Sequence, residues 1–127
     1  LTLVCLASCA APTDTDLLWE NAIYTSDTEL GEGSKTFIFK VVVEENTVTF
    51  TIHTDEDTVG DALISLGLIA GEDSQFGLYV KQVNGMSADY DVDQTYWAFY
   101  VNGEYGMTGV DSTTIVESDI YSFVRSK

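Results

Sequence analysis

The stretch KTFIFKVVVEENTVTFTIHTDEDTVGDALISLGL, from Lys35 to Leu68, decides the fold of this 127-residue chain. It begins with two runs rich in β-branched and aromatic residues, which are separated by the Glu-Asn pair at positions 45–46. In the second run the apolar side chains of Val48, Phe50 and Ile52 alternate with polar ones. This alternation is typical of strands that bury one face and expose the other.

The next segment has the pattern of an amphipathic helix. Thr58-Val-Gly-Asp61 resembles a capping box in which Asp replaces Glu. Apolar residues then recur at the spacing of one helical face, namely Val59, Ala62, Leu63 and Leu66. Gly67 and Gly71 are natural ends for such a helix.

Three further β segments are expected after the helix. GLYVKQVNGM leads into an Asn84-Gly85 turn, TYWAFYVNGEYGM forms a hairpin around Asn102-Gly103, and SDIYSFVRS near the end forms the last strand. The order of two strands, one helix and three β segments predicts an α+β domain. We expect a β-grasp-like fold over residues 35–127, with a mixed sheet and one main helix packed on one face.

The first residues predict a bacterial lipoprotein. Leu6-Ala7-Ser8-Cys9 follows an apolar run and has the pattern of a lipobox, in which Cys9 receives the lipid. The run is too short to span a membrane. We therefore expect a partial signal peptide at residues 1–8, a tether and lead-in at 9–34, and an extracytoplasmic domain anchored to the membrane or cell surface. A short buried strand with a chance lipobox pattern is the alternative.

The composition excludes several classes of function. The net charge of −16 disfavours nucleic acid, because proteins that bind phosphate backbones need basic patches. The sequence has no G-x-S-x-G, H-E-x-x-H or P-loop motif, which indicates that the protein is not an enzyme and has no cofactor. The single histidine, His53, lies on the polar face of its strand, as a solvated residue or as a metal ligand.

An acidic repeat raises the question of calcium. Asp89-x-Asp91-x-Asp93 begins like an EF-hand loop, but Gln94 stands at the sixth position and Tyr100 at the twelfth. Those positions need Gly and a bidentate Glu, so the EF-hand is excluded. A looser calcium site and a solvated acidic turn both remain open, and no metal site is assigned.

Five aromatic side chains gather at the Asn102-Gly103 hairpin. Strand alternation places Trp97 and Phe99 on one face, where the helix can cover them. The aromatic and flexible residues around the turn are either core and rim or a surface for a flat ligand. The candidate ligand-binding residues are Tyr96, Trp97, Tyr105, Gly106, Met107 and Thr108.

Four motifs resemble a known family. They are TVGDALISLGL, VNGM, YWAFYVNGEYGMTGV and ESDIYSFV, and in this order they cover Thr47 to Val124. This part of the chain is similar to the bacterial domains of unknown function related to the C-terminal domain of transcobalamin and intrinsic factor. The resemblance implies a β-grasp-like fold, and it places the segment from Tyr105 to Gly109 and the aromatic strand before it nearest the corrin of cobalamin.

These observations together predict a lipid-anchored module that binds a small ligand, with cobalamin or another corrinoid as the candidate. A surface protein or a transporter is a candidate partner. The alternative is a non-catalytic, adhesive module that interacts with proteins or glycans at the cell surface.

Overall fold

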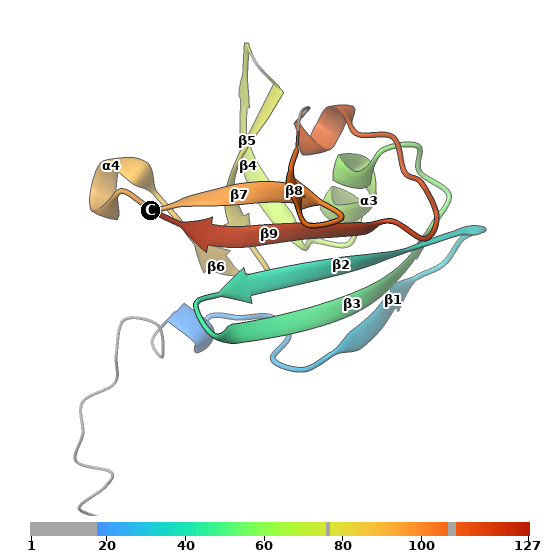
Figure 1. Ribbon diagram of the computed structural model, residues 1–127, viewed down its shortest axis with the longest axis horizontal. Coiled ribbons are helices and arrows are strands. Elements are labelled where there is room, and N and C mark those ends of the chain that lie inside the picture. Colours follow the sequence, from blue (N-terminus) through green and yellow to red (C-terminus); the bar gives the residue numbers. More distant parts are fainter. Residues whose placement is uncertain (1–17, 76, 107–108) are drawn as a thin grey trace, which may run out of the picture.

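The computed structural model describes residues 18–75, 77–106 and 109–127, and Figure 1 shows their arrangement. A six-stranded mixed sheet has the order β1-β3-β2-β9-β7-β8. The pairs β1–β3 and β2–β9 are parallel and the other pairs are antiparallel. Its strands are β1 (Thr28–Gly31), β2 (Lys35–Val43), β3 (Asn46–Thr54), β7 (Tyr96–Val101), β8 (Glu104–Tyr105) and β9 (Ile120–Ser126).

A second, three-stranded sheet has the order β4-β5-β6, and its β4–β5 hairpin stands behind the first sheet in Figure 1. Short helical segments lie between the strands. The bounds are β4 (Ile69–Ser74), β5 (Gly77–Val83), β6 (Met86–Ser87), α3 (Val59–Ser65), α4 (Tyr90–Asp93) and the 3-10 turn η1 (Val110–Ser112).

The predicted faces of β2 and β3 are confirmed. Every second side chain is buried from Phe37 to Val43 and from Val48 to Thr54. The apolar side chains among them form one hydrophobic cluster with buried side chains of β7, β9 and α3. The turn lies one residue earlier than predicted, because Val43 pairs with Asn46 and leaves residues 44–45 at the corner.

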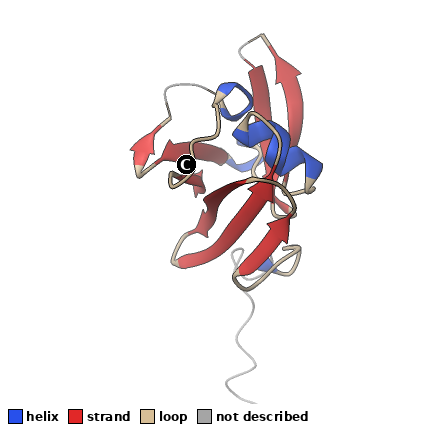
Figure 2. Ribbon diagram, turned by 90° about the vertical axis from the view of Figure 1, so that its right-hand side faces the viewer, coloured by secondary structure: helices blue, strands red, loops and turns tan. Residues whose placement is uncertain are grey.

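The helix α3 begins as predicted, since the Thr58 side chain accepts a hydrogen bond from the Asp61 backbone N–H at 3.1 Å. Val59, Ala62 and Leu63 are fully buried. The helix lies against η1 and β4 (Figure 2). Gly60 permits this contact, because a Cβ there would lie 2.7 Å from the Cα atom of Asp111.

The strand β4 was not predicted. Its residues from Ala70 to Ser74 are all exposed, so they lack the apolar alternation that marks a half-buried strand. Gly71, predicted to stop the helix, lies within this strand. A Cβ at Gly71 would lie 2.0 Å from the Tyr79 carbonyl oxygen, so the close pairing with β5 requires glycine.

The lead-in before β2 is part of the folded unit. The Asn84 amide is completely buried and forms two hydrogen bonds with the backbone of Tyr24, one from the Tyr24 N–H at 2.9 Å and one to its carbonyl at 2.8 Å. Nearby Leu18 and Trp19 pack against the core. The β5–β6 turn thus fixes a segment that lies 60 residues away in the sequence.

His53 links three strands of the main sheet. Its Nδ1 atom lies 2.9 Å from the Thr36 hydroxyl of β2, and its Nε2 atom contacts the Glu29 carboxylate of β1. The side chain therefore has protein partners on both sides, and we assign it a structural role at the β1 edge.

The mixed sheet and the main helix agree with the predicted α+β class. The fold also contains a second sheet that the sequence patterns did not indicate. The more specific assignment as β-grasp-like stays a prediction.

Candidate ligand-binding surface

The strand β7 presents two different faces. On the core side, Trp97 is 6% exposed and belongs to the hydrophobic cluster. Phe99 stacks parallel to Tyr121 with ring centroids 6.2 Å apart, and it packs at 5.2 Å on Phe123. Burial raises the pKa of Tyr121, whose hydroxyl accepts a hydrogen bond from the Val116 N–H. Trp97 and Phe99 therefore have a structural role on the core side of β7.

The opposite side of the hairpin carries three tyrosines, which we call the tyrosine edge: Tyr96, Tyr100 and Tyr105. Tyr96 and Tyr100 are half-buried, and Tyr105 is 62% exposed. The rings of Tyr100 and Tyr105 meet edge to face with centroids 5.6 Å apart. Such a pair is a favourable aromatic geometry that leaves the outer ring accessible.

The turn holds the tyrosine edge in place. Asn102 and Gly103 have φ angles of 52° and 85°, which fit the predicted two-residue turn. After β8, the Gly106 N–H donates to the Phe99 carbonyl oxygen at 2.8 Å. A Cβ at Gly106 would lie 2.8 Å from the Phe99 ring, so this position requires a residue without a side chain.

Two of the predicted site residues, Met107 and Thr108, lie outside the described residues, as does Cys9. Tyr105 and Gly106 lie at the turn end of the hairpin, where Tyr105 pairs with Tyr100. Tyr96 lies at the other end of β7, where it pairs with Ser126, and the next residue, Trp97, is buried in the core.

Asp111 is a polar residue near this segment that the sequence patterns did not single out. Its Oδ2 atom accepts a hydrogen bond from the Leu78 N–H at 3.1 Å. Its Oδ1 atom is buried and has no hydrogen-bond partner among the described residues. A Cβ at Gly77 would lie 2.9 Å from Oδ1, so glycine there makes room for the carboxylate. The role of Asp111 depends on the contact between η1 and β5, so a sequence pattern could not have indicated it.

The acidic repeat has structural roles. Asp89 caps α4 by accepting from the Asp91 N–H at 3.0 Å. Asp93 accepts from the Thr95 hydroxyl and contacts Arg125 at 3.1 Å, and these interactions lower the pKa of Asp93. Within the described ranges, no three His, Cys, Asp or Glu side chains are grouped so as to hold a metal ion.

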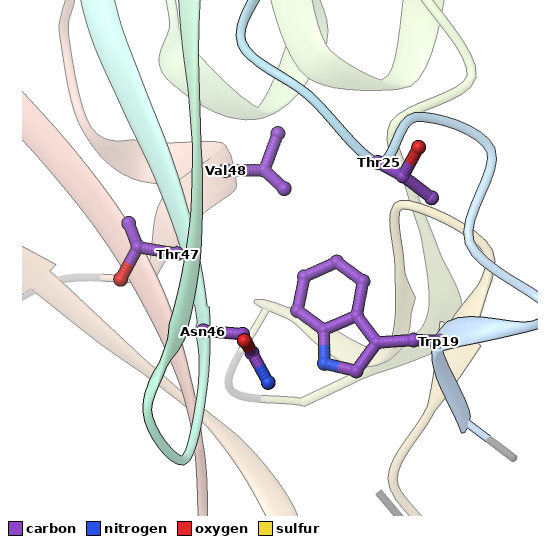
Figure 3. Close-up of a pocket in the computed structure, with 5 residues that line it drawn as sticks. All are labelled: Trp19, Thr25, Asn46, Thr47 and Val48. Atoms are coloured by element: carbon purple, nitrogen blue, oxygen red, sulfur yellow. The ribbon is translucent and has the colours of Figure 1, made fainter. Parts of the chain in front are cut away.

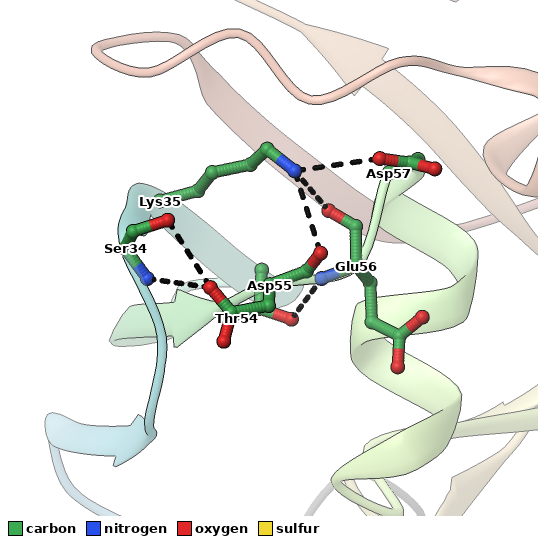
Figure 4. A network of polar contacts seen from close by, with 6 residues as sticks. All are labelled: Ser34, Lys35, Thr54, Asp55, Glu56 and Asp57. Atoms are coloured by element: carbon green, nitrogen blue, oxygen red, sulfur yellow. Dashed lines mark hydrogen bonds and ion pairs between the residues drawn. The ribbon is translucent and has the colours of Figure 1, made fainter.

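A second acidic region connects β2 with the loop before α3 (Figure 4). The Lys35 ammonium donates to the Glu56 carbonyl oxygen at 2.9 Å and contacts the Asp57 carboxylate at 3.4 Å. Asp55 accepts from the Ser34 N–H and hydroxyl, which lower its pKa. These carboxylates are therefore part of the loop structure.

The fold and this surface define a class: a small domain with a mixed sheet, one main helix and a tyrosine-bearing hairpin at the sheet edge. The chain belongs to the family described as "Domain of unknown function (DUF4430)", whose model matches residues 56–120. No curated protein sequence matches it significantly.

The solved structures with a similar fold include the following two. One is the crystal structure of "a putative metal binding protein from Ruminococcus gnavus ATCC 29149", with 26% identity and a TM-score of 0.69 over 74% of this chain and 98% of that one. The other is haptocorrin in complex with Cbi, with 20% identity and a TM-score of 0.56 over 77% of this chain. The match spans 26% of the haptocorrin chain. The predicted resemblance to transcobalamin-related domains of unknown function is confirmed.

In the part of the chain that the structure describes, no helix is both long enough and apolar enough to cross a bilayer.

Proposed function

We propose that this protein is a non-catalytic small-ligand-binding module with a corrinoid, such as cobalamin, as its ligand. The observation that carries the proposal is the tyrosine edge, where the largely exposed Tyr105 ring packs edge to face on Tyr100. The likeness in fold to haptocorrin, which was crystallised in complex with Cbi, supports the same assignment.

The tyrosine edge has suitable chemistry for a flat ligand. A phenol ring offers apolar area to a macrocycle and keeps its hydroxyl in water. Gly106 keeps the chain after β8 close to the Phe99 ring and so supports the position of Tyr105 beside it. Met107 and Thr108 follow directly in the sequence and, in this proposal, complete the surface.

We further propose that a lipid on Cys9 holds the module outside the cytoplasm, at the bacterial membrane or cell surface. The support is the Leu-Ala-Ser-Cys pattern and the polar residues that follow it. In this arrangement the module passes its ligand to a transporter or another surface protein.

The test is a titration of the full chain with cobalamin, in which the change in cobalamin absorbance measures binding. Tyr105→Ala and Met107→Ala are each expected to weaken binding about tenfold, which corresponds to about 1.4 kcal/mol. Tyr79→Ala is the matched control, because Tyr79 is a 40% exposed tyrosine on the other sheet. No spectral change with the parent protein would overturn corrinoid binding.

The Trp97→Ala variant distinguishes a structural role in the core from a direct contact with the ligand. Because Trp97 is buried in the core, this substitution is expected to destabilise the fold by about 3–5 kcal/mol. If Tyr105→Ala unfolds the protein to the same degree, the tyrosine edge is part of the core and the proposal loses its basis.

A second candidate is a non-catalytic module that interacts with proteins or glycans at the cell surface. It is favoured by the outer face of the main sheet, where half-buried side chains such as Thr49, Lys40, Ser122 and Tyr100 are neighbours on adjacent strands. Such an open sheet face suits a broad partner better than an enclosed ligand. Binding of the immobilised domain to purified surface proteins, with Tyr100→Ser as the weakened variant, tests this alternative.

A further inference from the structure

A surface hollow lies between the lead-in and the beginning of β3 (Figure 3). Its volume is about 340 Å³, and its lining residues are Trp19, Thr25, Asn46, Thr47 and Val48. In the main sheet, β2, β9 and β7 lie between β3 and β8, so the hollow is separate from the tyrosine edge.

The walls of the hollow are held firmly. Tyr24 is bonded to the buried Asn84, and the Thr49 N–H donates to the Asp27 carboxylate at 2.9 Å. These contacts fix both ends of the segment that carries Thr25. Trp19 packs against the core, so the hollow is a preformed feature of the fold.

Several hydrogen-bonding groups at this hollow have no partner among the residues that the structure describes. The Trp19 indole N–H is buried and has no acceptor among the described residues. It lies on the side of the ring nearest Asn46 in Figure 3. The side chains of Thr25, Asn46 and Thr47 form no hydrogen bond within the described ranges. A buried donor without a partner is rare in native proteins and needs an explanation.

The chemistry of the lining narrows the ligand class. None of the five lining side chains is charged, so a metal ion would find no carboxylate there. The net charge of −16 disfavours an anion. A purely apolar ligand would cover the amide and hydroxyl groups without bonding them, which is unfavourable. The remaining class is a neutral ligand with one apolar face and several hydroxyl groups.

We propose that this hollow binds a neutral sugar ring of an oligosaccharide. The C–H face of the sugar packs on the Trp19 indole and Val48, and its hydroxyls bond Asn46, the two threonines and the indole N–H. The volume lies at the small end of the range for ligand sites, which fits a single ring better than a large molecule. The inference is independent of corrinoid binding, and it gives a glycan-binding role a specific site.

The test titrates neutral oligosaccharides of glucose, mannose, galactose and N-acetylglucosamine into the full chain, with NMR detection of the indole N–H signals and, for the variant that lacks the Trp19 indole, of the Val48 backbone amide signal. The protein has two tryptophans, Trp19 and the buried Trp97, so the second is an internal control. One of these sugars is expected to shift the Trp19 signal in a saturable manner, with an affinity of about 1 mM, and to leave Trp97 unchanged.

The variants assign the binding to the hollow. Trp19→Phe keeps an apolar ring and removes the N–H, and Asn46→Ala removes the amide. Each is expected to weaken sugar binding about fivefold to tenfold. Thr47→Ala is expected to weaken it less, and its matched control is Thr51→Ala on the same strand, which lies outside the hollow and leaves the affinity unchanged.

The proposal is overturned if none of these sugars, at about 10 mM, shifts the Trp19 signal of the parent protein. It is also overturned if the affinity is unchanged in both Trp19→Phe and Asn46→Ala. A parallel cobalamin titration separates the two sites. Tyr105→Ala is expected to leave sugar binding intact, and Trp19→Phe is expected to leave the cobalamin response intact.

Discussion

Two Asn-Gly turns with nearly the same backbone allow a matched test of what fixes the lead-in. Asn84 and Asn102 both have φ of 52°, and the glycines after them have φ of 82° and 85°. Replacing either asparagine by glycine keeps a residue that accepts this conformation and adds similar chain flexibility. The loss of stability caused by the added flexibility is therefore the same in the two variants. The difference between their free energies of unfolding measures the side-chain contacts.

Those contacts differ in number and burial. The Asn84 amide makes two buried hydrogen bonds, and Asn84→Gly leaves the N–H and the carbonyl of Tyr24 without these partners. Asn102 makes one exposed bond, to the Ile120 N–H at 2.8 Å, which water can replace. At about 1 kcal/mol for each bond, and more where a peptide group stays unpaired, Asn84→Gly should cost about 2–4 kcal/mol and Asn102→Gly about 1 kcal/mol or less.

Urea unfolding followed by circular dichroism measures the difference. With a slope of about 1–3 kcal/mol per molar urea, the Asn84→Gly midpoint should fall by about 1 M or more. Hydrogen exchange of the Tyr24 amide provides a local readout, which should speed up in Asn84→Gly and stay unchanged in Asn102→Gly. Equal midpoints for the two variants, together with a still-protected Tyr24 amide, would refute the claim that Asn84 fixes the lead-in.

Three other predictions concern the helix, the acid response and the anchor. Leu63→Ala is expected to lower the free energy of unfolding by about 2–5 kcal/mol, because Leu63 is fully buried. Ile64→Ala, at a 46% exposed position, should lower it little. Equal losses in denaturant unfolding would show that the buried face of the helix is assigned wrongly. The folded-state pKa of Asp93 is lowered, so its charged form stabilises the fold above the ordinary carboxyl pKa, and this stabilisation is lost as the pH falls through the lowered value. Asp93→Asn should therefore lose less stability than the parent below about pH 4 in acid titrations. Cys9→Ser should give an unprocessed protein without lipid, and mass spectrometry that finds a mature, unacylated end elsewhere would contradict it.

The features that could be predicted from the sequence depend on local patterns. The alternation of Val48, Phe50 and Ile52 and the cap at Thr58 each involve residues a few positions apart, so the sequence contains the full signal. The same is true of the turn at Asn102, whose side chain and following glycine determine its type.

The features that could not be predicted depend on distant contacts. The exposed strand β4 has no apolar alternation, and it is defined by its pairing with β5. The lead-in is placed by Asn84, 60 residues away from Tyr24. At the candidate site, alternation separated Trp97 from Tyr96 correctly. The buried Oδ1 atom of Asp111 and the hollow beside Trp19 depend on contacts between segments that are far apart in the sequence.

The position of β9 has a consequence for how the protein is made. This strand follows all the others in the sequence, but it lies between β2 and β7 in the sheet, and Ile120 pairs with Ile38. Until a ribosome has released β9, the β2 and β7 edges have no neighbour at this position and can pair with other chains. We therefore expect the nascent chain to depend on chaperones that shield open edges. A recombinant fragment cut at residue 120, where the family match ends, should aggregate rather than fold.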